Sequence, residues 1–110
     1  MEHQISREGT HHIVSLNGEV DLENSPKARQ ILLDVVGREK KVLVDLSGVT
    51  YMDSSGIASL VEAYQHAKKQ GAEFSLVRVN PAALRVLKLA RLDKVFIIHE
   101  TLENALNADI

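Results

Sequence analysis

Two adjacent serines, Ser54 and Ser55, are the side chains best placed to carry chemistry. They stand in the segment Asp53-Ser54-Ser55-Gly56, directly before apolar residues at helical spacing. The first turn of a helix presents unpaired N–H groups and a partial positive charge, and both favour an anion. A phosphoryl group on Ser55 would add about −1.5 to −2 charges there. The pattern predicts a modifiable hydroxyl at a helix mouth, where added charge can repel a docked partner.

The same residues have a purely structural interpretation. Aspartate and serine before an amphipathic helix are ordinary capping residues, and Asp53 would accept hydrogen bonds from the N–H groups of the first turn. Residue types and spacing alone leave capping and modification both open.

An enzyme with Ser55 as nucleophile is the alternative from a different functional class. The Gly-x-Ser-x-Gly spacing is absent, since Asp53-Ser54-Ser55-Gly56 has a single glycine. The chain has no cysteine and no glycine-rich phosphate loop. The histidines show neither zinc-site nor catalytic spacing; they are His3, His11, His12, His66 and His99. We therefore expect no enzymatic activity, no metal and no cofactor.

Strand and helix signals alternate along the 110 residues and predict one α/β domain with a mixed sheet. The expected strands are Gln4 to Arg7 in a hairpin with His11 to Leu16, a short piece at Gly18 to Val20, Lys41 to Leu46, Phe74 to Val79, and Val95 to His99. The expected helices run from Asn24 or Ser25 to Gly37, from Asp53 to Lys69, from Asn80-Pro81 to about Ala90 or Leu92, and from Thr101 to Ala108. Ser47 to Met52 is expected to be a loop.

The third of these helices carries apolar residues on two sides. Ala83, Leu84, Leu87 and Ala90 form one face at helical spacing, which predicts a core face. Val86 and Leu89 fall on the opposite flank, where they are either buried on a second side or form an exposed docking patch.

Charge and composition argue against two classes of partner. The formal net charge is −2, no block of lysine and arginine is present, and four aromatic residues are too few for a base-stacking platform. No apolar run approaches the length of a membrane span, and the first ten residues show no secretory signal. We expect a cytoplasmic protein, monomeric when free, that binds no nucleic acid and does not insert into membranes.

The sequence resembles the STAS domain (sulfate transporter and anti-sigma factor antagonist), especially the bacterial anti-sigma factor antagonists. Asp53-Ser54-Ser55-Gly56 is similar to the family signature. Gly18-Glu19-Val20-Asp21 resembles the turn before the first helix of the family. Asn80-Pro81-Ala82 and Leu92-Asp93-Lys94-Val95-Phe96 resemble its third helix and its lead into the last strand. The likeness extends in register from about Gly18 to Leu106 and implies a single STAS domain over residues 1–110.

The resemblance implies a binding switch. An antagonist of this family binds an anti-sigma factor that is also a serine kinase of the histidine-kinase-like ATPase superfamily. That kinase phosphorylates the second serine of the signature, here Ser55, and phosphorylation blocks binding. A metal-dependent serine phosphatase restores it, and the unphosphorylated antagonist frees the sigma factor. Asp21 and Asp53 are then expected to orient Ser55, and Gly56 to let the phosphoryl donor approach.

One departure from the family pattern and two alternatives within the family remain. Ser25-Pro26 stands where the family often has a Thr-Ala pair, and the proline alters the backbone beside the docking surface. The alternative is a STAS accessory subunit that regulates the ATPase of a lipid-transport ABC transporter, since Ala67-Lys68-Lys69-Gln70-Gly71 resembles that subunit too. The double serine Ser54-Ser55 favours the antagonist. A third possibility is a scaffold protein of a stress-signalling complex, against which the short chain argues.

Overall fold

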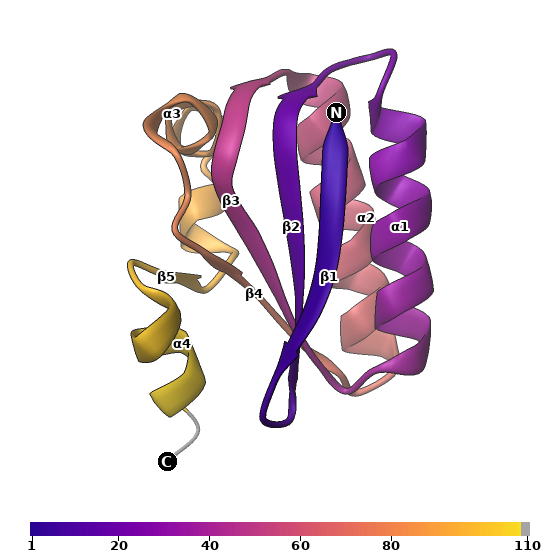
Figure 1. Cartoon of the computed structure of the whole chain (residues 1–110). Helices are drawn as coiled ribbons and strands as arrows, with labels where there is room; N and C mark the ends of the chain where they lie inside the picture. The colour runs from indigo at the N-terminus through magenta and orange to yellow at the C-terminus, as the bar shows by residue number, and fades with distance from the viewer. Residues whose placement is uncertain (109–110) are drawn as a thin grey trace.

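Alternating strands and helices build one α/β layer structure, which a computed structural model describes for residues 1–108 (Figure 1). The strands are β1 (Glu2–Glu8), β2 (His11–Val20), β3 (Lys41–Met52), β4 (Glu73–Val77) and β5 (Ile98–His99). The helices are α1 (Ser25–Arg38), α2 (Ser54–Lys69), α3 (Pro81–Leu89) and α4 (Leu102–Asn107), with a short 3₁₀ turn at Leu92–Lys94. The expected mixed sheet with four helices is confirmed.

The five strands lie in the order β1-β2-β3-β4-β5. β1 pairs with β2 as an antiparallel hairpin, and Gly9 in the connecting turn has a φ of 62°. The other three pairs are parallel. Because β2, β3 and β4 end at the same edge of the sheet, the mouths of α1, α2 and α3 gather at that edge, at the top of Figure 1.

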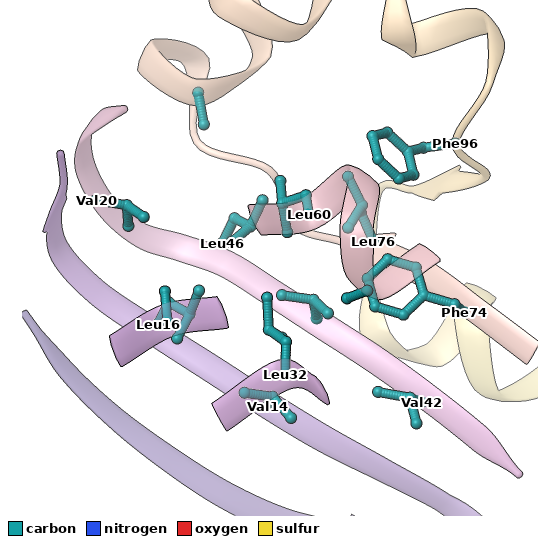
Figure 2. Packing of buried hydrophobic residues seen from close by; sticks show 14 of the residues in the cluster. Val14, Leu16, Val20, Leu32, Val42, Leu46, Leu60, Phe74, Leu76 and Phe96 are labelled. Atoms are coloured by element: carbon teal, nitrogen blue, oxygen red, sulfur yellow. The ribbon is translucent and has the colours of Figure 1, made fainter. Parts of the chain in front are cut away.

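The main core lies between the sheet and α1 and α2. Alternate residues of each strand point to this side, among them Val14 of β2 and Val42 of β3, and both are buried. Figure 2 shows Val14 beside Leu32 of α1, and Leu60 of α2 beside Leu46 and Leu76 of the sheet. Ala83 and Leu87 of α3 join the same cluster. This packing fixes the first turns of α1 and α2 against the ends of β2 and β3.

The other side of the sheet has a smaller cluster. Ile13, Leu43 and Val77 point to it, and Ala105 of α4 covers them. Beside this cluster the buried Asp45 carboxylate pairs with the half-exposed Arg78 guanidinium. The Ser47 N–H donates to the other oxygen of Asp45 at 2.9 Å.

Two strands are longer than the sequence indicates. Gly18 to Val20 is not a separate piece but the end of β2, and the expected loop at Ser47 to Met52 is the second half of β3. The end of β2 pairs with the second half of β3. The register shifts between Ser15 and Asn17 and again between Gly18 and Glu19. Glycines and polar residues normally indicate turns, but here they form an irregular stretch of strand.

Other boundaries also differ from expectation. Gly37 lies inside α1, which ends at Arg38, because its φ is not left-handed and the helical hydrogen bonds continue past it. β5 contains only Ile98 and His99, because the 3₁₀ turn occupies part of the preceding segment. Ala90 is exposed rather than in the core, since α3 ends one residue before it.

Candidate functional site

Asp53 caps the helix that carries the two serines. Its Oδ1 accepts hydrogen bonds from the N–H groups of Ser55 at 2.9 Å and Gly56 at 3.3 Å. The capping interpretation is therefore confirmed for Asp53. Capping leaves the serine side chains free for other roles: Ser54 is exposed and Ser55 is half-buried in the first turn of α2.

Gly56 lies where α2 comes closest to the sheet. A Cβ at this position would lie 2.5 Å from the Val20 carbonyl oxygen and 2.8 Å from Met52 Cγ. Real Cβ atoms do not approach other atoms so closely, so a glycine is needed for the packing of the protein's own chain. The structure thus explains the glycine by packing within the chain, whereas the sequence suggested that it lets a partner approach. Gly56 is itself buried.

Asp21 organises the turn that leads into α1. Its Oδ1 accepts from the Asn24 N–H at 2.9 Å, and its carbonyl oxygen accepts from the Ser25 N–H at 2.7 Å. Asn24 precedes the helix without a side-chain cap, since its amide donates back to the Glu19 carbonyl oxygen at 3.1 Å. The residue before Asp21, Val20, accepts from the Asp53 N–H at 3.5 Å. Asp21 and Asp53 therefore belong to adjoining turns at the same end of the sheet.

A buried hydroxyl joins the mouths of the two helices. Ser59 Oγ lies 3.1 Å from the Ser25 carbonyl oxygen of α1 and 3.2 Å from the Ser55 carbonyl oxygen of α2, and it donates its hydrogen between them. This bond fixes the position of Ser55 relative to α1. Spacing places Ser59 on the apolar stripe of α2, but nothing in the sequence indicates its partner.

Ser55 lines a shallow hollow between α1 and α2. The hollow is lined by Ser25, Pro26, Arg29, Ser55, Ala58, Ser59 and Glu62. Arg29 pairs with Glu62 across it, and both side chains are about half exposed. Pro26, which departs from the family pattern, thus lies beside Ser55. The sequence does not indicate Arg29 or Glu62 as neighbours of Ser55, because their approach depends on how the two helices pack.

Exposed apolar side chains occur on α3 and on the segments that lead into α1 and α2. Leu22 in the β2–α1 turn is 75% exposed, Tyr51 at the end of β3 is 50% exposed, and Leu89 of α3 is 80% exposed. We call these three residues the apolar rim. Val86 does not share this exposure: it is half-buried, packs on the core, and lines a groove with Tyr51. Of the expected pair on α3, only Leu89 stands out from the surface.

Nothing in the described part of the chain suggests a metal or a membrane span. Residues 1–108 contain no group of three or more histidine, aspartate or glutamate side chains that could hold an ion. No helix among those residues is long and apolar enough to cross a bilayer.

Comparison with known proteins relates this geometry to a family. The STAS domain model matches residues 4–105. The anti-sigma F factor antagonist of Paenibacillus polymyxa is 31% identical over 96 residues, which cover 86% of this chain and 82% of that protein. The anti-sigma-B factor antagonist of Bacillus subtilis is 27% identical over 82 residues, covering 74% and 75%.

A solved structure agrees with these relatives. The crystal structure of an anti-sigma factor antagonist from Mycobacterium paratuberculosis superposes with a TM-score of 0.89 at 30% identity, covering 97% of this chain and 92% of that one. The family model spans nearly the whole chain, and the mouth of α2 with Ser55 lies within the matched residues. The three relatives above are named anti-sigma factor antagonists, and the chain belongs to the STAS domain family.

Proposed function

We propose that this protein is an anti-sigma factor antagonist that binds an anti-sigma factor with serine kinase activity and is switched off by phosphorylation of Ser55. The family and the names of its relatives support the first part. The position of Ser55 supports the second. Its side chain stands in the first turn of α2, in a hollow open to solvent, while Asp53 alone caps the helix.

The modification is a phosphoryl transfer from ATP held by the partner. The Ser55 Oγ forms a bond to the γ-phosphorus, the bond from that phosphorus to the bridging oxygen breaks, and ADP leaves. The hydroxyl proton passes to a base on the kinase. Since Asp53 already caps α2 and the core lies beneath it, the domain keeps its fold. The added charge then opposes docking at this surface.

The neighbours of Ser55 have separate roles in this proposal. Asp21 and Asp53 fix the two turns that present the serine. Ser54 is exposed beside it and contacts the partner directly. Gly56 contributes by keeping α2 close to Val20. All act by binding and positioning, without catalysis by this chain.

The apolar rim supplies the hydrophobic contact area of the docking surface. Leu22, Tyr51 and Leu89 present apolar area to solvent on three different elements around the helix mouth, as expected of an interaction site. Val86 supports this surface from below through the groove it shares with Tyr51. Binding through these residues sequesters the anti-sigma factor and frees the sigma factor. A metal-dependent serine phosphatase reverses the phosphorylation.

Intact mass and partner capture from native cells test this function together. We expect a fraction of the protein to be about 80 Da heavier than the unmodified chain. That fraction should vanish in Ser55→Ala, whereas Ser54→Ala keeps the acceptor hydroxyl and should retain a modified fraction, lowered only as far as its contact with the kinase contributes. Capture should recover an anti-sigma factor with a kinase ATPase fold. Absence of the heavier form, with capture of a transporter ATPase instead, would favour the STAS accessory subunit of a lipid transporter.

A further inference from the structure

We propose that Arg29 gives up its ion pair with Glu62 and binds the phosphoryl group on Ser55. This inference rests on the proposed function, since it requires that Ser55 be phosphorylated. It adds a residue of α1 that recognises the modified state within the same chain.

The cap at the mouth of α2 already uses backbone donors that a phosphate would need. The N–H groups of Ser55 and Gly56 already donate to Asp53 Oδ1 at 2.9 and 3.3 Å. A phosphate at Ser55 would compete with that carboxylate for the same donors, and the two negative charges would repel each other. A nearby cation would therefore stabilise the dianion.

Arg29 is the one cationic side chain that lines the hollow around Ser55, among the residues the structure describes. Its Nε donates to Glu62 Oε2, with the two side chains 52% and 46% exposed. An ion pair so exposed to water contributes little to stability and is easily exchanged. A phosphate dianion offers more charge and three acceptor oxygens to the planar guanidinium, so it is the stronger partner.

The placement of the helices allows the exchange. α1 and α2 lie side by side and run in the same direction (Figure 1). Ser55 and Glu62 lie about two turns, or about 10 Å, apart along α2. Helical side chains lean toward the N-terminal end of their helix, which for Arg29 is the end where Ser55 lies. A change of side-chain rotamer can therefore carry the guanidinium from Glu62 toward Ser55.

The exchange changes the surface in a second way. When Arg29 leaves, the Glu62 carboxylate loses its partner and stands exposed in the same hollow. Phosphorylation then presents a phosphate held at the top of the hollow and a free carboxylate lower on α2. The negative charge seen by a partner spreads over two helical turns instead of one residue.

The test uses protein that carries phosphoserine at position 55, inserted during translation, so that no kinase is needed. Phosphorus NMR follows the second ionisation of the phosphoserine, whose free pKa is about 6. The charged groups facing it are Arg29 from α1, Glu62 from α2 and Asp53 at the cap. A nearby cation favours the dianion and lowers the midpoint. Arg29→Gln should raise the midpoint by about 0.5 pH unit or more.

Two further variants sharpen the result. Glu62→Gln removes the competing carboxylate and should lower the midpoint below that of the unsubstituted phosphoprotein. Arg38→Gln is the matched control, because Arg38 lies on the same helix, pairs with Asp34 and does not line the hollow. Its midpoint should not move.

A second signal reports on the guanidinium directly. The Nε–Hε resonance of Arg29 should shift between unmodified and phosphorylated protein. Equal midpoints for the phosphoprotein and its Arg29→Gln variant, or an unchanged Arg29 resonance, would overturn the inference. Failure of the unmodified protein to capture an anti-sigma factor would instead count against the proposed function, and it would leave these NMR results unaffected.

Discussion

The first turn of α2 approaches the end of β2 so closely that a Cβ on Gly56 would lie 2.5 Å from the carbonyl oxygen of Val20. Both atoms in this contact are close to backbone, so neither can rotate away. The contact sets the height of α2 above the sheet and hence the position of Ser55, one residue earlier. The glycine after the serines is therefore a packing residue of the site.

Gly56→Ala should lower the free energy of unfolding by about 1–3 kcal/mol, because the new methyl group forces the helix mouth away from Val20 and Met52. Urea denaturation measures this. The control is Gly37→Ala, a helical position where a Cβ meets nothing within 4 Å. That variant should be more stable by about 0.5–1 kcal/mol. Equal effects of the two alanines would contradict the close contact.

Asp53→Ala should cost about 1 kcal/mol of stability, because two N–H groups of the first turn lose their acceptor. Asp53→Asn keeps an acceptor oxygen and should lose little. Thermal or urea unfolding separates the two. If asparagine and alanine destabilise the protein equally, the role of Asp53 is not that of a cap.

Arg78→Ala should destabilise the domain by about 1–3 kcal/mol, because it leaves the buried Asp45 carboxylate without its charged partner. Arg78 has a φ of 51°, and alanine has the same backbone strain there, so the comparison isolates the side chain. The double variant with Asp45→Asn should recover part of the loss. Additive effects in that cycle would show that the two residues do not interact.

Leu89→Asp should weaken binding to the captured anti-sigma factor by at least about tenfold, or about 1.4 kcal/mol. Leu89 is 80% exposed, so the fold should remain unchanged, as circular dichroism and thermal melting would show. Ile97→Asp is the matched control, since Ile97 is 62% exposed and lies away from the helix mouth, beside β5. Equal loss of affinity in both variants, or unfolding of Leu89→Asp, would contradict the apolar rim.

Local patterns predicted the elements well where one signal dominated. Asp53 before an amphipathic stripe, and Asn80-Pro81 before another, marked the starts of α2 and α3 correctly. Prediction was wrong where glycine and polar residues lie inside a strand. Ser47 to Met52 looks like a loop, but it extends β3 because the end of β2 pairs with it. That pairing is non-local, so no local pattern reveals it.

The site shows the same division. Asp53 and Ser55 are two residues apart in the sequence, whereas Asp21 was indicated as their neighbour only through the family resemblance. The structure places the turns of all three at one end of the sheet. No pattern in the sequence indicates that Arg29 and Glu62 share the hollow with Ser55, because this depends on the packing of α1 against α2. Interhelical contacts of exposed charges leave no periodic signal in a single sequence.

The affinity of the captured anti-sigma factor for unmodified protein and for protein with phosphoserine at position 55 tests the central claim most directly. Isothermal titration calorimetry at physiological salt measures both. We expect the phosphorylated form to bind at least about a hundredfold more weakly, or about 2.7 kcal/mol, as for like charges brought together at an interface. Equal affinities for the two forms would show that Ser55 is not the switch.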